Sequence, residues 1–170
     1  MSHEGNFTTE KVRNYLKQFG RDNEVIELHE SSATVELAAQ ALKTLPAIIC
    51  KTLSFQTPSG PVLVMAAGDA RIDNQKFRAQ FNCKCNMLKS SDVFELTGYP
   101  PGGVCGFDNP EPCKKYCDVS LKRFSHVFPA CGTASSAIKL TCDELFTLTK
   151  SIEWIDVCKA WDPNLKEPSE

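Results

Sequence analysis

A lysine stands in line with the apolar residues of a predicted strand. Residues 47–56 are rich in branched and apolar side chains, and counting by two places Lys51 on one face with Ile49 and Phe55. Because an ammonium group is costly to bury alone, Lys51 must reach solvent, pair with an acid, or face a pocket that receives an anion. A lysine that protects an edge strand, or burial of the opposite face around Cys50, are the alternative explanations.

Two glycine-containing turns could supply main-chain hydrogen-bond donors. Gly102 and Gly103 follow two prolines in a loop over Tyr99–Gly106, and glycine permits close approaches that a side chain would block. Backbone amides freed in this way can donate to a carbonyl oxygen or an oxyanion. Gly132, between two predicted strands, could also let a ligand approach. A plain surface turn, or a hairpin turn at Gly132, is the alternative interpretation.

The nine cysteines and three histidines allow two other kinds of chemistry. Four thiolates that could be imagined around zinc are Cys83, Cys85, Cys113 and Cys117. Their spacings differ from those of common zinc modules, and a free cysteine is often only a small core residue. A thiol nucleophile needs a nearby base, and the sequence places no histidine beside a cysteine. We therefore expect no metal and no cofactor, and interpret most cysteines as free thiols.

The composition predicts one globular domain. A chain of 170 residues can bury enough surface to fold without disulfides or metals. A hydrophobic content of 42% with 24% charged residues rules out general disorder. We expect a single domain over residues 1–162 and a disordered tail over residues 163–170.

Charge and hydropathy exclude several partners. The formal net charge of −2 gives no broad basic field, so we expect no duplex DNA partner, and any nucleic acid must be held locally. No apolar run approaches the length of a membrane span, and the first residues lack the apolar core of a secretory signal. The expected location is the cytoplasm, and the sequence does not predict the oligomeric state.

Hydrophobic periodicity predicts helices interleaved with short strands. The predicted helices run from Thr8 or Thr9 to Phe19, over Thr34–Leu42 as far as Pro46, from Asp73 to Asn82, from Ser91 or Asp92 to Gly98, and over Leu145–Lys150 after a capping box at Thr141–Glu144. The predicted strands are Glu24–His29, Ala47–Gln56, Pro61–Ala67, Lys115–Asp118, His126–Ala130, Ala137–Leu140 and Trp154–Val157. This order, with one central hairpin, indicates an α/β or α+β domain around a mixed sheet.

Several segments together resemble a known family. In chain order they are Ser31-Ser32-Ala33-Thr34-Val35-Glu36-Leu37-Ala38-Ala39, Cys50-Lys51-Thr52-Leu53, Gly68-Asp69-Ala70-Arg71, Thr97-Gly98-Tyr99-Pro100-Pro101-Gly102-Gly103-Val104, Asp118-Val119-Ser120-Leu121 and Gly132. Over about residues 8–157 the chain resembles the YbaK and prolyl-tRNA synthetase editing-domain family. The resemblance implies the α/β editing-domain fold, a mixed sheet with flanking helices.

The resemblance also implies an activity. Members of this family hydrolyse the ester of a mischarged aminoacyl-tRNA, and a free-standing chain would act in trans on the acceptor end of the tRNA. Lys51 matches the characteristic functional lysine, which would meet the terminal phosphate or ribose. Gly102, Gly103 and Val104 match the loop whose backbone would orient the ester carbonyl. Water or the neighbouring ribose hydroxyl would be the nucleophile.

Further positions are implied as walls of the amino-acid pocket. They are the segment His29–Leu37 with His29 and Thr34, then Thr52, and then Gly132 and Thr133. Three positions depart from the family pattern: Gly106 stands where the loop usually has proline, Cys131 where the later turn usually has a first glycine before Gly132, and Ala137 where some Cys-tRNA deacylases carry an acid. The alternative function is therefore that of a catalytically idle relative, which binds an aminoacyl-adenosine-like ligand or a tRNA end.

Overall fold

The computed structural model describes residues 7–29 and 34–167, and each predicted helix is present. The helices are α1 (Glu10–Lys17), α2 (Val35–Leu42), α3 (Asn74–Phe81), α4 (Ser90–Thr97) and α5 (Cys142–Leu148), with 3₁₀ turns η1 (Asp22–Glu24), η2 (Pro46–Ile48) and η3 (Val119–Arg123). The strands are β1 (Ile26–Glu27), β2 (Ile49–Thr57), β3 (Gly60–Ala67), β4 (Arg71–Ile72), β5 (Asn86–Met87), β6 (Lys114–Asp118), β7 (His126–Pro129), β8 (Ser136–Ala137), β9 (Leu140–Thr141), β10 (Trp154–Ile155) and β11 (Cys158–Lys159).

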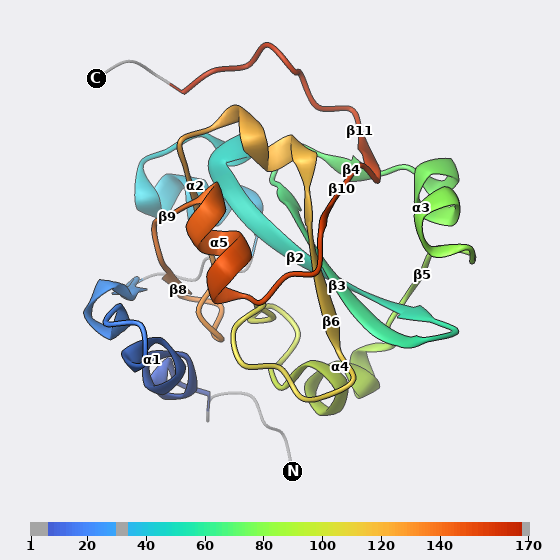
Figure 1. The fold of residues 1–170 in the computed structure, drawn as a ribbon. Helices are drawn as coiled ribbons and strands as arrows, with labels where there is room; N and C mark the ends of the chain where they lie inside the picture. Colours follow the sequence, from blue (N-terminus) through green and yellow to red (C-terminus); the bar gives the residue numbers. More distant parts are fainter. Residues whose placement is uncertain (1–6, 30–33, 168–170) are drawn as a thin grey trace.

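A seven-stranded mixed sheet forms the centre of the fold (Figure 1). Its strands follow the order β10-β6-β3-β2-β7-β9, and β5 also pairs with β2. β2 and β3 form the predicted antiparallel hairpin, from Cys50 opposite Ala67 to Thr57 opposite Gly60. β6 runs parallel to β3, and β7 runs parallel to β2. These pairings confirm the predicted α/β class with a mixed sheet and flanking helices.

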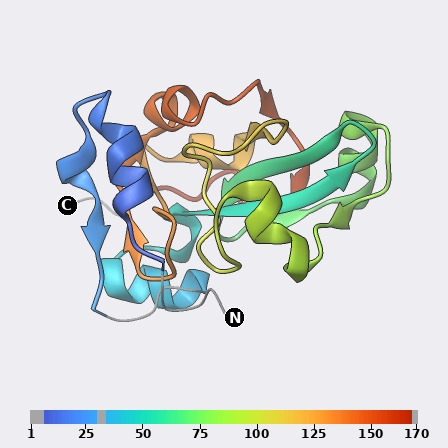
Figure 2. The same cartoon turned by 90° about the horizontal axis from the view of Figure 1, so that it is seen from below.

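Helices cover both faces of this sheet. The two views in Figures 1 and 2 place α5 on one face and α2 on the other. Ile49 packs with Ala38 and Ala39 of α2, whereas its neighbour Cys50 belongs to the main core with Leu145 of α5. Because side chains alternate along a strand, β2 is buried on both faces at its start.

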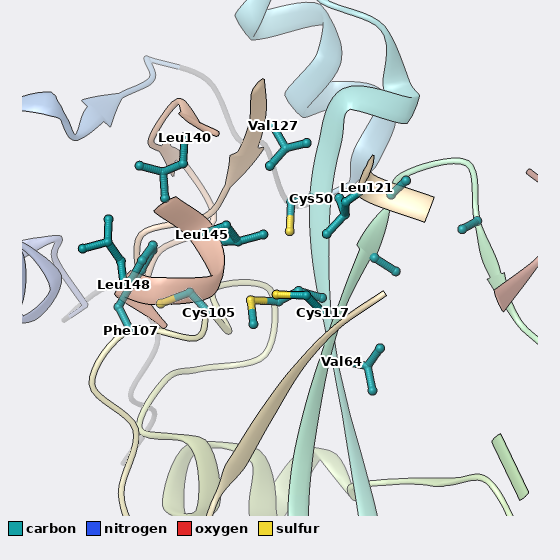
Figure 3. Packing of buried hydrophobic residues seen from close by; sticks show 14 of the residues in the cluster. Cys50, Val64, Cys105, Phe107, Cys117, Leu121, Val127, Leu140, Leu145 and Leu148 are labelled. Atoms are coloured by element: carbon teal, nitrogen blue, oxygen red, sulfur yellow. The ribbon is translucent and has the colours of Figure 1, made fainter. Parts of the chain in front are cut away.

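Thiols form part of the main core. All nine cysteines are free, and six of them are buried. Figure 3 shows Cys50, Cys105 and Cys117 among the leucines of the core between β2 and α5. Burial raises the pKa of Cys105 and of Cys117 to about 12. These thiols therefore stay protonated and pack as small apolar side chains, as the sequence interpretation expected.

One predicted strand is in fact two. The segment predicted as Ala137–Leu140 divides into β8, which pairs with β1, and β9, which pairs with β7. The Ile138 amide between them donates to the Pro129 carbonyl at 3.0 Å. The prediction was wrong because one hydrophobic run serves two different sheets, and its pattern does not show where it changes partner.

The end of α2 also differs from the prediction. Pro46 was expected to end this helix, but α2 ends at Leu42, where Lys43 adopts a left-handed conformation with φ of 56°. Pro46 instead begins η2, because proline suits the first position of a helical turn. The predicted strand Glu24–His29 is likewise shorter, since residues 22–24 form η1.

The C-terminal segment lies on the fold as far as residue 167. Leu165 packs against the main core, and the Ser125 hydroxyl donates to a Glu167 carboxylate oxygen at 2.9 Å. The predicted domain boundary at residue 162 stays a prediction. Among the described residues, no helix combines the length and apolar content needed to cross a membrane.

Replacing Thr141 by alanine tests the capping box that begins α5. The Thr141 hydroxyl accepts from the Glu144 amide at 3.1 Å, and the Glu144 carboxylate accepts from the Thr141 amide at 2.8 Å. We expect Thr141→Ala to lower the free energy of unfolding by about 1 kcal/mol, and the melting temperature by about 2–4 °C. Thr147→Ala, at an exposed position inside α5, is the control and should change stability by less than about 0.5 kcal/mol. Equal effects in calorimetry would contradict the capping role.

Candidate active site

A cavity opens where the hydrogen-bonded edge of β2 is interrupted. β2 pairs with β7 only at Ile49 and Cys50, and with β5 only at Phe55 and Gln56. Between these pairings, residues 51–54 line a cavity of about 420 Å³. Most of its other walls are apolar side chains of α2, α4, β7 and the segment after α4, among them Val35, Ala38, Leu42, Val93, Val104 and Phe128.

Lys51 lines this cavity, and its amine is held at one turn. The half-buried Lys51 Nζ donates to the carbonyl of Gly68 at 3.4 Å and to the carbonyl of Ala70. Burial lowers the pKa of Lys51, while the nearby Asp69 carboxylate acts in the opposite direction. The predicted position of the lysine, on a strand and at a cavity, agrees with this geometry.

The turn that receives the amine is rigidly built. A Cβ on Gly68 would lie 2.0 Å from the Pro46 carbonyl oxygen, so only glycine fits there. The Asp69 carboxylate accepts two hydrogen bonds from the Arg123 guanidinium, at 2.6 and 2.9 Å. The Arg123 side chain is only 5% exposed. A bidentate pair of this kind fixes orientation as well as charge, so the turn presents Lys51 with carbonyl oxygens at defined positions.

The two predicted glycine turns contact each other. A Cβ on Gly103 would lie 2.7 Å from the Gly132 carbonyl oxygen, and a Cβ on Gly132 would lie 2.9 Å from the Tyr99 ring. Gly102 and Gly132 have φ of +89° and +91°, which glycine adopts without strain. Figure 2 shows the loop after α4 close to the segment that follows β7. The turns therefore pack back to back, with glycine required at the contact.

Only part of the glycine loop faces the cavity. Gly102 and Val104 line it, whereas Gly103 does not. The Gly103 amide donates to the Pro100 carbonyl at 2.9 Å, so it is committed to the turn. Within residues 7–29 and 34–167, the amides of Gly102 and Val104 donate to no other main-chain carbonyl. These two amides are the ones left to meet a ligand.

Polar side chains brace the loop that lacks the family proline. The Asn109 side chain donates to the carbonyls of Thr97 and Cys105 at 2.8 and 2.9 Å. The Tyr99 hydroxyl donates to the Phe107 carbonyl. A Cβ on Gly106 would lie 3.0 Å from the Met65 sulfur, so this position is tightly packed. Sequence reasoning missed the Asn109 brace, because nothing in the local sequence marks an asparagine that reaches across a loop.

The remaining predicted site residues occupy four different places. Thr52 lines the cavity. Thr133 is not a lining residue, but its hydroxyl donates at 2.8 Å to the hydroxyl of Ser136, a cavity residue that the sequence did not indicate. Thr34 caps α2 by accepting from the Leu37 amide at 3.1 Å. His29 lines a separate pocket, and residues 30–33 of the predicted wall lie outside the described residues.

The alternative zinc site does not form a cluster. In the part of the chain that the structure describes, no group of three or more His, Cys, Asp or Glu side chains could hold a metal ion. Cys113 and Cys117 are buried, while Cys83 and Cys85 are partly exposed in the segment after α3.

Fold, cavity and comparisons together define the class of protein. The chain belongs to the aminoacyl-tRNA editing domain family, whose sequence profile matches residues 29–148. This match confirms the family that the motifs predicted.

Individual relatives extend the same likeness over nearly the whole chain. It is 49% identical over 152 residues to the uncharacterized protein YwhH of Bacillus subtilis, an alignment that covers 89% of this chain and 97% of that protein. A solved structure of a protein proposed to be a trans-editing enzyme for prolyl tRNA synthetase has a TM-score of 0.81 and 29% identity, over 89% of this chain and 96% of that one. The hypothetical protein APE2540 has a TM-score of 0.77 and 25% identity, over 88% and 99% of the two chains.

Proposed function

We propose that this protein is a trans-acting aminoacyl-tRNA deacylase, which hydrolyses the ester between an amino acid and the acceptor end of a mischarged tRNA. One observation carries the proposal: Lys51, Gly102 and Val104 line the same cavity, and within the described residues the amides of Gly102 and Val104 donate to no main-chain carbonyl. A cation and a pair of main-chain donors are what a phosphorylated ribose ester requires from a binding site. The editing-domain family supports the same reaction.

The proposed chemistry needs no side chain as nucleophile. Lys51 holds the terminal phosphate or ribose of the acceptor end, and the loop amides donate to the ester carbonyl oxygen, where negative charge develops. Water adds to the carbonyl carbon, the bond from that carbon to the ribose oxygen breaks, and the ribose oxygen takes the proton that the water gives up. If the neighbouring ribose hydroxyl adds first, the acyl group moves to that oxygen, the first ribose oxygen takes the hydroxyl proton, and water then cleaves the new ester in the same way.

A deacylation panel tests the proposal. The purified chain is incubated with tRNAs that carry alanine, cysteine, serine, threonine or proline, and release of the amino acid is followed over time. At least one ester should be hydrolysed by the wild type and by the control Lys17→Ala, an exposed lysine of α1. Hydrolysis of none of the five would reject the enzyme.

A binding protein without activity is the second candidate. The feature that favours it is Gly106, where the family loop usually carries proline. Such a protein would bind a non-hydrolysable aminoacyl-adenosine analogue, with an amide in place of the ester, and would leave all five esters intact. Binding together with hydrolysis would reject this candidate.

The rate of deacylation should depend on the charge of Lys51. Burial lowers the pKa of this amine, because the charged form loses hydration. The ammonium form, which binds phosphate, therefore loses its proton at a lower pH than the ammonium group of an exposed lysine does. We expect the enzyme-dependent rate, after subtraction of base hydrolysis of the ester, to fall on the alkaline side below the ordinary lysine pKa. A rate that stays level up to that pKa would contradict a role for the ammonium.

A further inference from the structure

One residue of β2 lies in the middle of the interrupted edge. The pairing with β7 ends at Cys50 opposite Pro129, and the pairing with β5 begins at Phe55 opposite Met87. The Leu88 amide also donates to the Ser54 carbonyl at 3.1 Å. Thr52 is left between the two partners, at the wall of the cavity.

The register of the hairpin fixes where the main chain of Thr52 points. In an antiparallel pair, the N–H and C=O groups of alternate residues point to opposite edges of the strand. The Ser54 carbonyl points away from β3, since it accepts from Leu88. Thr52 is two residues earlier and has the same orientation. Its N–H and C=O therefore face the gap, whereas those of Lys51 and Leu53 face their partners on β3.

The side-chain hydroxyl of Thr52 also lacks a hydrogen-bond partner within the described residues. Its hydroxyl oxygen is buried and has no hydrogen-bond partner among the residues that the structure describes. A buried hydroxyl without a partner is destabilising, and most buried polar atoms in native proteins are satisfied. Thr52 thus brings a main-chain donor and a carbonyl acceptor to the gap in the strand edge, and its buried hydroxyl is unsatisfied beside them.

We propose that the aminoacyl group of the substrate pairs with Thr52 as a one-residue strand. The α-ammonium group and the ester carbonyl of an amino acid occupy the same places as the N–H and C=O of a strand residue. The Thr52 carbonyl and hydroxyl oxygens accept from the α-ammonium group, and the Thr52 amide joins the loop amides as a donor to the ester carbonyl oxygen. A strand edge recognises an extended peptide in this way, and here the gap has room for a single residue.

This assignment rests on the proposed function and adds how the enzyme would recognise esters of amino acids as a class. Recognition through the main chain is independent of the amino-acid side chain, which is left to the apolar walls formed by α2, β7 and Val104. The α-ammonium group is common to all esters of amino acids and absent from other esters. Thr52 would therefore select the class of substrate, and the apolar walls would select its members.

Amide hydrogen exchange tests the open edge directly. In the free protein, the Thr52 amide should exchange at least 10-fold faster than those of Lys51 and Leu53, which are bonded to β3. The probe is an adenosine analogue in which an amide at the 3′ position replaces the ester to the amino acid. The amino acid is the one whose tRNA ester is hydrolysed fastest, or alanine if no ester is hydrolysed. This probe should slow exchange at Thr52, and the matched analogue without the α-amino group should bind about 10-fold more weakly.

Each outcome decides the inference separately from the proposed function. Slow exchange at Thr52 in the free protein overturns the inference, whatever the activity. Protection of Thr52 by the aminoacyl probe supports it even if no ester is hydrolysed. Hydrolysis without protection at Thr52, or equal protection by adenosine alone, overturns it while the deacylase stands. Failure of both binding and hydrolysis overturns both.

A pair of variants gives a second readout. Thr52→Val keeps the shape of the side chain and removes the hydroxyl, whereas Thr52→Ser keeps the hydroxyl. We expect Thr52→Val to raise the melting temperature by about 2–4 °C, because an unsatisfied buried group is removed, and to weaken probe binding by about 10-fold. Thr52→Ser should bind like the wild type. Lower stability together with unchanged binding in Thr52→Val would indicate a purely structural hydroxyl and reject its part in recognition.

Discussion

Replacing Lys51 by alanine should lower kcat/KM for deacylation by about 10²–10³-fold, the usual effect of removing one charge-stabilising group from an active site. Lys51 lines the same cavity as Gly102 and Val104 of the glycine loop. No other lysine or arginine lines this cavity, so no neighbouring cation in the described part of the chain can replace it. The loss should appear with every tRNA ester that the wild type hydrolyses.

Lys51→Met separates the charge from the packing of the side chain. Methionine keeps most of the apolar stem of lysine but leaves the carbonyls of Gly68 and Ala70 without their donor. The loss of this donor should lower the free energy of unfolding by about 1 kcal/mol. Part of this loss is offset, because the variant no longer has to bury an ammonium group. We expect a folded variant, by circular dichroism and thermal melting, with the same loss of activity as Lys51→Ala. Activity close to that of the wild type in either variant would reject the role of the lysine.

Gly103→Ala should damage both the fold and the activity. The new methyl group would meet the main chain of the neighbouring turn, with the Gly132 carbonyl oxygen at 2.7 Å and its carbon at 2.9 Å. Backbone atoms cannot rotate away, so the two turns must separate. Overpacking of this kind costs about 1–3 kcal/mol, and a displacement of about 1 Å at the amides of Gly102 and Val104 can lower the rate about 10²-fold.

Gly102→Ala is the matched control, because it changes the next residue without a collision. The nearest atom to a Cβ there is the Ala134 Cβ at 3.9 Å. Its positive φ of +89° makes alanine unfavourable by about 1–2 kcal/mol, but the contact between the turns is kept. Urea denaturation and deacylation rates should therefore place the activity of Gly103→Ala well below that of Gly102→Ala. The reverse order would show that the contact with Gly132 does not position the loop.

Local signals in the sequence were enough for the main elements. The capping box at Thr141, the Asp73 side chain that caps α3, and the left-handed Gly98 after α4 are formed by neighbouring residues, so their patterns predict them. The same holds for the β2–β3 hairpin, whose strands are joined by a two-residue turn. These elements needed no information from distant parts of the chain.

Local signals did not predict the strand pairings between segments that are far apart in the sequence. β4 pairs with β11, with Ile72 opposite Cys158, and β1 pairs with β8, with Ile26 opposite Ala137. The sequence did not predict β4 and β11, because strands of two residues have too little periodicity to be recognised. β1 and β8 overlap predicted strands, but their pairing depends on a partner that is far away in the sequence.

The candidate site shows the same division. The apolar face interrupted by Lys51 and the paired glycines each marked a candidate position, and the family resemblance implied that they belong to one site. The structure brings Lys51 and Gly102 to the same cavity. The unpaired position of Thr52 depends on where two other strands stop, and the support from Asn109 depends on a fold-back of the loop. Neither leaves a pattern in the local sequence, because both follow from tertiary contacts.

The buried thiols of the core can report local unfolding of the protein. Alkylating reagents attack the thiolate, and burial raises the pKa of Cys158, Cys117 and Cys105 in the native state. These sulfurs lie on strands and loops that reach from the sheet to the glycine turn, and react only when their own surroundings loosen. The order in which these cysteines are alkylated in dilute denaturant therefore shows which part of the molecule unfolds first, and no cysteine has to be introduced for the experiment.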